Sequence, residues 1–226
     1  MVANEQGMLL ENLKELAPGS AVPSLFADQL IGLLKIYYLT GGMPEVVARW
    51  VQDRDLEDAL QWLVGAGMVH KVCRVEKPGI PLSAHSQPQS FKLYLADCGL
   101  MRRLARVPAS AIMDDSPHYT EFKGALVENY VLNQLVTFLE DLPYYWQSGN
   151  TAEVDFIVRL GGLIVPIEVK SATNVRSRSL ALYREKFRPE LAVRLSLLNV
   201  KKQDGLLNAP LYWIGAMVGG ASAYPS

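Results

Sequence analysis

The sequence is poor in cysteine and histidine. Among its 226 residues are two cysteines, Cys73 and Cys98, which stand far apart in apolar segments. Neither has the spacing of a metal-ligand or redox motif, so we expect buried free thiols in a reducing compartment. The three histidines are scattered along the chain. They support neither a zinc site nor a nucleophilic triad, so function must be sought in other side chains.

The sequence also shows no segment that would indicate a cellular compartment or a nucleotide-binding site. No signal peptide is visible at the N-terminus, and the apolar stretch at 213–219 is too short to span a bilayer. The phosphate-binding pattern G-x-x-x-x-G-K-[ST] does not occur. We therefore expect a soluble cytoplasmic protein with no membrane contact and no ATP site in this chain.

Charge is nearly balanced over the whole chain but divided locally. With 22 basic and 23 acidic residues, no global field attracts nucleic acid. Residues 114–160, however, carry eight acidic and two basic side chains, whereas residues 170–204 carry nine basic and three acidic ones. Carboxylates for a cation beside Arg and Lys for phosphates are what a metal-dependent phosphodiesterase needs. The same charge runs also coat ordinary solvated helix faces, so both interpretations stay open.

The first half of the chain predicts helices and then a small strand pair. Half of the residues are hydrophobic, enough for one or two domains with a core. Residues 1–58 predict helices. Residues 59–115 predict a helix followed by strands at 70–76 and 90–95, which resembles part of a winged helix. The polar stretch before residue 116 predicts a boundary there, with 116–226 as a separate domain.

Residues 116–226 alternate between helical and strand patterns. This order predicts an α/β fold, a mixed sheet flanked by helices. The expected elements, in chain order, are a helix at 122–139, strands at 144–147, 152–159 and 164–170, a helix at 175–187, and strands at 191–199 and 210–218.

The most informative stretch is a hairpin around Gly161-Gly162. Val and Ile flank this pair, and glycines in a two-residue turn take positive φ without a Cβ clash. If the two glycines form the loop, Asp155 lies opposite Glu168, and Glu153 lies opposite Lys170. Alternation then places these four charged side chains on one face. The other face would carry Val154, Phe156, Ile167 and Val169.

Two carboxylates that face each other across a hairpin need an explanation. Directly opposed Cβ atoms lie roughly 4.5–5.5 Å apart, and like charges there destabilise a sheet. A Mg²⁺ or Mn²⁺ ion between Asp155 and Glu168 would remove that repulsion. The alternative is an exposed hairpin with mixed charges, in which Glu153 and Lys170 form an ion pair worth less than about 1 kcal/mol.

Glu128 and three arginines extend the metal interpretation. Glu128 lies on the apolar stripe of the helix at 122–139, where a carboxylate is costly unless a cation or a donor offsets its charge. Alternatively, it lies at the margin of the stripe and reaches water. Arg176, Arg178 and Arg184, on the helix after the hairpin, are candidate phosphate contacts, or else they coat a solvated helix face.

Taken together, these patterns carry a family likeness. The helix–strand–strand–strand–helix–strand order, with an acid on the first helix and an E-x-K on a hairpin, resembles the PD-(D/E)XK restriction-endonuclease-like superfamily. More narrowly, nearly the whole chain resembles the C-terminal domain of unknown function attached to prokaryotic AAA-type ATPases. The stretches that carry this likeness are Tyr37–Glu45, Phe91–Leu100, Lys123–Asn129, Glu153–Phe156 and Pro166–Lys170.

The resemblance implies roles for individual residues. Asp155 and Glu168 match the superfamily's metal ligands, which hold Mg²⁺ or Mn²⁺. Lys170 matches the lysine that orients the attacking water and stabilises phosphate charge, and Glu128 matches the accessory carboxylate of the helix. We expect Glu153 to support the metal ligands without binding the metal itself.

Two features depart from the family. The N-terminal ATPase domain is absent, and the helical stretch between Trp50 and Ala59 is shorter than in relatives. Residues 1–58 are therefore expected to be a remnant linker, and 59–115 an incomplete winged-helix-like region.

Two classes of function remain open at this stage. The leading hypothesis is a metal-dependent nuclease-fold domain that binds nucleic acid, DNA ahead of RNA; hydrolysis of its phosphodiesters is the stronger form of that hypothesis. The alternative is a truncated, non-catalytic regulatory or interaction module of an ATPase family. A third hypothesis is that the chain associates with a protein partner or with itself.

Overall fold

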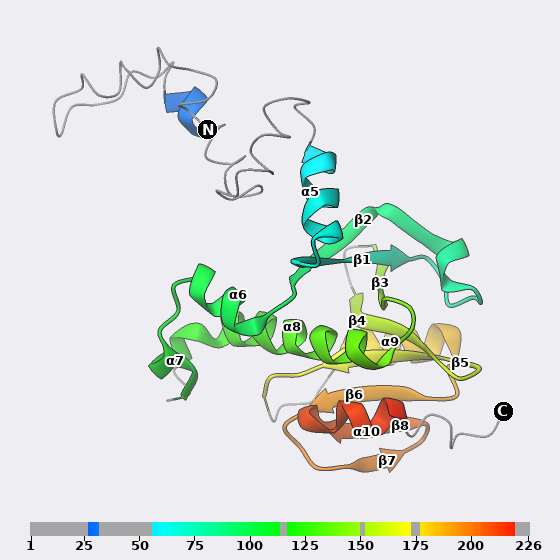
Figure 1. Cartoon of the computed structure of the whole chain (residues 1–226). Coiled ribbons are helices and arrows are strands. Elements are labelled where there is room, and N and C mark those ends of the chain that lie inside the picture. The colour runs from blue at the N-terminus through cyan, green and yellow to red at the C-terminus, as the bar shows by residue number, and fades with distance from the viewer. Residues whose placement is uncertain (1–26, 32–55, 114–116, 150–151, 173–176, 220–226) are drawn as a thin grey trace, which may run out of the picture. The chain divides into compact units, whose positions relative to one another are not determined.

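The computed structural model describes residues 27–31, 56–113, 117–149, 152–172 and 177–219 (Figure 1). The chain divides into two compact units between Met68 and Val69. In the first unit, a short helical segment at 27–31 and helix α5, Leu56–Gly65, are described. The other helices predicted in 1–58 lie outside the described residues.

The second unit is built on one eight-stranded mixed sheet (Figure 1). The strands, in the order β2-β1-β3-β4-β5-β6-β8-β7, confirm the α/β class. The strands are β1 Val69–Val75, β2 Ser86–Leu95, β3 Tyr144–Ser148, β4 Ala152–Leu160, β5 Leu163–Val169, β6 Ala192–Ser196, β7 Lys201–Gln203 and β8 Leu206–Pro210. The helices are α6 Cys98–Leu104, α7 Ala109–Met113, α8 Thr120–Phe138, α9 Arg178–Phe187 and α10 Ile214–Gly219, with single 3₁₀ turns η1 Leu82–His85, η2 Pro117–Tyr119 and η3 Leu211–Trp213.

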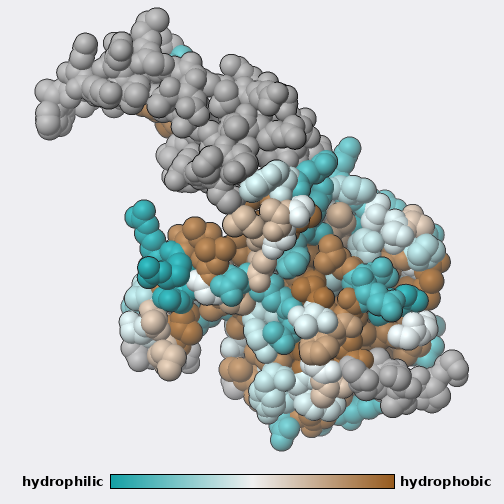
Figure 2. Space-filling view, viewed as in Figure 1, coloured by the Kyte–Doolittle hydropathy of each residue, from teal (hydrophilic) through white to brown (hydrophobic). Residues whose placement is uncertain are grey.

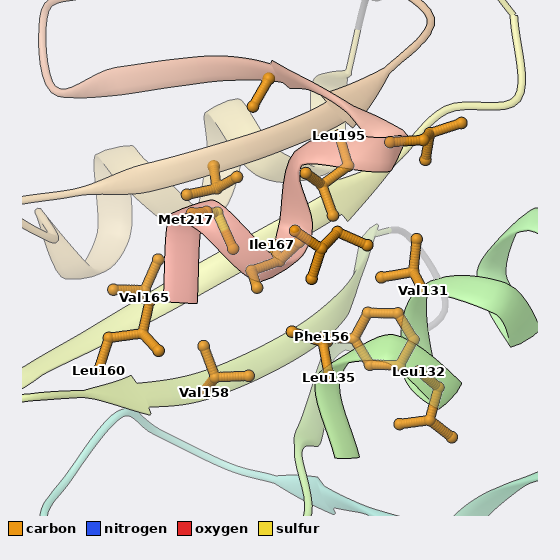
Figure 3. Close-up of a cluster of buried hydrophobic side chains, with 14 of the residues drawn as sticks. Val131, Leu132, Leu135, Phe156, Val158, Leu160, Val165, Ile167, Leu195 and Met217 are labelled. Atoms are coloured by element: carbon orange, nitrogen blue, oxygen red, sulfur yellow. The ribbon is translucent and has the colours of Figure 1, made fainter. Parts of the chain in front are cut away.

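Helices cover both faces of this sheet. Helices α8 and α10 pack against each other on one face, and α9 covers the other (Figure 1). The first core cluster lies on the α8 side, where Leu132 and Leu135 meet strand residues such as Phe156 and Ile167 (Figure 3). The second cluster lies on the α9 side, where Tyr183 packs edge-on against Trp146. The sheet therefore sits between two separate hydrophobic layers.

The hairpin predicted around Gly161-Gly162 is present in the predicted register. Strands β4 and β5 pair antiparallel from Leu160 opposite Leu163 to Phe156 opposite Ile167. Gly161 takes a φ of +58°, the left-handed value that a tight turn requires at its first central position. The predicted alignment of the two strands is thus confirmed as far as Phe156.

The prediction that Val154 and Phe156 share one face is wrong. Strand β3 pairs with β4 through Tyr144 opposite Ile157 and Trp146 opposite Val154, so two residues of β4 face one of β3. This β-bulge shifts the alternation by one position. Phe156 packs in the first cluster, whereas Val154 packs in the second.

The C-terminal strand predicted at 210–218 is also wrong. Strand β8 ends at Pro210, and the chain continues as η3 and then α10. Ile214 and Met217 are spaced by three residues, and both are buried in the first cluster, which requires a helix and not a strand. A third difference is helix α7, which forms within the polar stretch where a domain boundary was predicted.

The sheet runs across the predicted boundary at 115/116. Strands β1 and β2 form the predicted antiparallel pair, but β1 also pairs in parallel with β3, with Arg74 opposite Tyr145. Residues 69–95 therefore share one sheet with the strands of 116–226. This differs from the predicted separate winged-helix-like region, because β1 offered a free edge that β3 occupies.

Candidate functional site

The bulge in β4 determines where Asp155 lies. Asp155 and Phe156 are the two β4 residues opposite Tyr145 of β3. The Asp155 carboxylate takes over a place in the ladder, because its Oδ2 accepts a hydrogen bond of 2.7 Å from the backbone N–H of Val169. The bulge thus lets the backbone of the neighbouring strand β5 hold the Asp155 carboxylate in place.

Asp155 is surrounded by negative charge. Burial raises the pKa of its carboxyl group most, and the charges of Glu128 and Glu168 raise it further, to about 8, against the lowering effect of the Val169 N–H. The folded protein therefore favours the protonated form of Asp155 more than water does. Both residues that the sequence placed beside Asp155 act on it electrostatically.

Glu128 and Glu153 share a cation from an unexpected element. The Lys92 ammonium, on β2, lies 3.1 Å from Glu128 Oε1 and also pairs with Glu153. The Tyr94 hydroxyl, two residues along the same strand, donates a hydrogen bond to Glu128. Burial lowers the pKa of Lys92, but the charges of Glu128 and Glu153 outweigh it and leave that pKa raised. Glu128 is thus compensated by an ammonium and a hydroxyl donor, which agrees with the first of the two alternatives that the sequence left open.

Sequence reasoning missed Lys92 and Tyr94 as members of this site. Both belong to the stretch Phe91–Leu100 that carries the family likeness, and they alternate on one strand face. That spacing was a usable signal. The contact could not be read from local patterns, because Lys92 and Tyr94 are more than 30 residues from Glu128 and reach it only through tertiary contacts such as the hydrogen bonds between Leu95 and Asn129.

Glu168 is the most buried carboxylate of the group. It is 4% exposed, and its Oε1 lies 2.6 Å from the Lys170 ammonium, so the E-x-K pair contact each other directly. Its Oε2 has no hydrogen-bond partner among the described residues. Arg194 lies opposite Glu168 in the parallel β5–β6 pair. Burial lowers the pKa of Arg194, and the charge of Glu168 partly offsets that effect.

The carboxylates do not gather into a preformed cage. Among the described ranges, no three or more Asp, Glu, His or Cys side chains stand together as metal ligands would. Asp155 and Glu168 nevertheless lie close enough for one charge to shift the pKa of the other, and Glu168 Oε2 is free to accept. A cation could therefore be held by these two carboxylates, with the remaining positions left to water and substrate oxygens.

The predicted phosphate contacts are placed differently from one another. Arg178 is exposed at the start of α9, where the Ser177 side chain caps the helix by accepting from the Leu180 N–H at 3.1 Å. Arg184 is half-buried and donates to the Asp204 carbonyl oxygen, which fixes it on the β7–β8 turn. Arg176 lies outside the described residues. Of the two described arginines, Arg178 has the exposure that a phosphate contact needs.

Both cysteines are free thiols, as predicted, but they are only half-buried. Cys98 lies beside the amide groups of Asn129 and Asn133, and burial raises the pKa of its thiol. The predicted burial of the two thiols is therefore only partial. Within the described stretches, no helix combines the length and the apolar character needed to cross a membrane.

Comparison with known families places two parts of the chain. Residues 123–214 match the family described as Domain of unknown function (DUF4143), and residues 51–111 match the Domain of unknown function (DUF8612). The two matches flank the predicted boundary, although the sheet crosses it. The expected likeness to a domain of unknown function is confirmed.

Two mycobacterial proteins are similar to part of the chain. They are the uncharacterized protein Mb2031c of Mycobacterium bovis and the uncharacterized protein Rv2008c of Mycobacterium tuberculosis. Each is 35% identical over 96 residues, which is 42% of this chain and 21% of the relative. The match thus spans about a fifth of the length of these relatives. No solved structure matches the chain.

Proposed function

We propose that residues 69–226 form a divalent-metal-dependent phosphodiesterase domain of the PD-(D/E)XK type that acts on nucleic acid, DNA ahead of RNA. One observation carries the proposal: the half-buried Asp155 has a pKa raised by desolvation and, beyond that, by the charges of two further carboxylates, Glu128 and Glu168. Fold stability alone does not favour such crowding, since a neutral side chain would avoid the repulsion. Crowded carboxylates are typical of sites that receive a cation.

The residues present fit such an ion. Asp155 and Glu168 would hold Mg²⁺ or Mn²⁺, because hard cations take carboxylate oxygens and Glu168 Oε2 lacks another partner in the described chain. When bound, the ion would lower the pKa of a bound water and neutralise charge on the scissile phosphate. The Arg194 guanidinium lies opposite Glu168 in the β5–β6 pair and interacts with its charge.

The neighbouring side chains have separate tasks in this proposal. Lys170 contacts Glu168 and would orient the attacking water or stabilise charge that develops on the phosphate. Glu128 and Glu153, held by Lys92, would keep the site negative and support Asp155 without binding the metal directly. Arg178 would contact a phosphate of the bound strand.

A cleavage assay with labelled DNA and millimolar Mn²⁺ tests the proposal. Asp155→Asn, Glu168→Gln and Lys170→Met should each reduce cleavage by about 10²-fold or more, since each removes a charge used in the transition state. Glu185→Gln is the matched control, because Glu185 is an exposed carboxylate on α9. Equal cleavage by wild type, Asp155→Asn and Lys170→Met would refute the assignment.

A second function, a non-catalytic interaction module, is favoured by one specific observation. The ion pairs Lys92–Glu128, Lys92–Glu153 and Lys170–Glu168 already give three of the four carboxylates a cationic partner without a metal. In that case the carboxylates would have a structural role in the packing of the fold. The chain would then bind a protein partner, such as an ATPase relative, or a second copy of itself.

Calorimetry separates the two functions. The module predicts no heat on addition of millimolar Mn²⁺ and wild-type stability in Glu168→Gln, whereas the phosphodiesterase predicts metal binding that the same substitution removes. Sedimentation at tens of micromolar then tests self-association, which a clean monomer would contradict.

A further inference from the structure

We infer that a second, separate surface of this chain binds the phosphate backbone of nucleic acid. It is the turn at the end of α6 that carries Arg102, Arg103 and Arg106, named here the arginine turn. The nucleic-acid assignment rests on the proposed function, but the binding itself does not depend on cleavage.

The backbone of the arginine turn is fixed by its own hydrogen bonds. The N–H of Arg106 donates to the carbonyl of Arg103, and the N–H of Val107 donates to the carbonyl of Arg102, each at 3.1 Å. Together with a left-handed φ of +56° at Arg106, these bonds form a Schellman motif. Val107 is buried just after it, which anchors the turn to the protein.

Arginine occupies a position in this motif that favours glycine. A residue with a Cβ in the left-handed region costs roughly 1–2 kcal/mol relative to its usual conformation, whereas glycine bears no such cost. The presence of a long cationic side chain at a strained position points to a use for that side chain.

The three arginines line one hollow, and their positive charge suits an anion. A hollow of about 640 Å³ is lined by these arginines together with Leu104, Val107, Pro108 and Ala109, and no acidic side chain is among these lining residues. Arg102 is held in place, because its Nη1 donates to the Val107 carbonyl at 2.8 Å. Arg103 and Arg106 are exposed and form no ion pair within the described part of the chain.

The surroundings favour a polyanion over a small anion. Hydrophilic side chains stand out from the surface at this end of α6, next to apolar ones (Figure 2). Leu104, 65% exposed, lies between the arginines. Arg103 and Arg106 are exposed along this turn, so their cations can contact successive phosphates of a strand. Charge complementarity therefore selects nucleic acid as the partner.

A binding assay in EDTA separates this surface from the proposed active site. Fluorescence anisotropy of a labelled DNA duplex is measured against salt concentration for the wild-type chain and Arg103→Ala/Arg106→Ala. Loss of two phosphate contacts should lower the magnitude of the log K versus log salt slope by about 2 and weaken binding at least tenfold. The matched control is Lys201→Ala/Lys202→Ala on strand β7, which removes the same charge elsewhere.

Arg106→Gly distinguishes a binding role from a structural one. Glycine is favoured at this position, so the variant should unfold about 2–4 °C higher than wild type and yet bind DNA more weakly. A purely structural arginine would show no loss of binding.

Several results would overturn the inference. They are no DNA binding by the wild-type chain, unchanged binding by the double-arginine variant, an equal loss in the double-lysine control, or equal competition by an acidic polypeptide. Absence of Mn²⁺-dependent cleavage with arginine-dependent binding intact would refute the phosphodiesterase alone.

Discussion

Substitution of Asp155 by Asn should stabilise the metal-free protein at alkaline pH. Asparagine has the same shape and keeps an oxygen that accepts from the Val169 N–H, but it carries no charge. The ordinary carboxyl pKa is 3.8, and in the folded chain it is raised to about 8. One pKa unit corresponds to about 1.4 kcal/mol, so ionised Asp155 costs the folded state up to roughly 6 kcal/mol.

The sign of the pH dependence follows from that shift. Between pH 4 and pH 8 the unfolded chain holds fewer protons at this group than the folded chain, so the free energy of unfolding falls as the pH rises. The wild-type chain should therefore lose stability through this window, and Asp155→Asn should not lose this contribution. The stability difference between the two should grow by roughly 3–6 kcal/mol from pH 4 to pH 8.5.

Urea unfolding in EDTA measures this effect. Tryptophan fluorescence provides the signal, since Trp146 is buried in the second core cluster. Asp141→Asn is the control, because the Asp141 side chain is 77% exposed and its pairing with Arg159 lies at the surface. Parallel stability curves for wild type and Asp155→Asn across the whole pH range would refute the reasoning.

Three further predictions follow from the same contacts. The affinity for Mn²⁺ should rise about tenfold per pH unit between pH 6 and pH 8 and then level off, because the metal competes with the Asp155 proton. Calorimetry across this range measures the affinity, and a constant value would contradict the idea. Lys92→Met should destabilise the fold by about 1–3 kcal/mol at pH 7 and by less at pH 4, since Glu128 and Glu153 lose a shared cation; an equal loss in urea unfolding at both pH values would argue against a charge effect. Leu132→Ala should cost about 2–5 kcal/mol in the same unfolding assay, as expected for a fully buried side chain, and a cost below about 1 kcal/mol would contradict its place in the core.

Local patterns in the sequence predicted the central hairpin well. The Gly161-Gly162 pair and the Val- and Ile-rich flanks were enough to set the register, because turn geometry determines which residues face each other. Helix α8 and strands β3 to β6 were also expected close to their observed positions. Each of these elements carries its own periodic signal.

Features that depend on distant partners could not be predicted in this way. The bulge at Asp155 arises from pairing with β3, and no sequence pattern within β4 indicates its position. The contact of Lys92 with Glu128 joins residues 36 positions apart and depends on tertiary contacts between β2 and α8. Around 210–218, the apolar residues fit a strand and a helix equally well until packing against α8 selects the helix.

The parallel β1–β3 pair has a practical consequence for work on isolated fragments. Residues 116–226, cut at the boundary that local composition suggests, would lack β1 and β2. Strand β3 would then present an unpaired edge, which favours aggregation. Glu128 would also lose its contacts with the Lys92 ammonium and the Tyr94 hydroxyl. A fragment that starts at Val69 retains both, so an inactive or insoluble shorter piece would say nothing about the chemistry of the intact sheet.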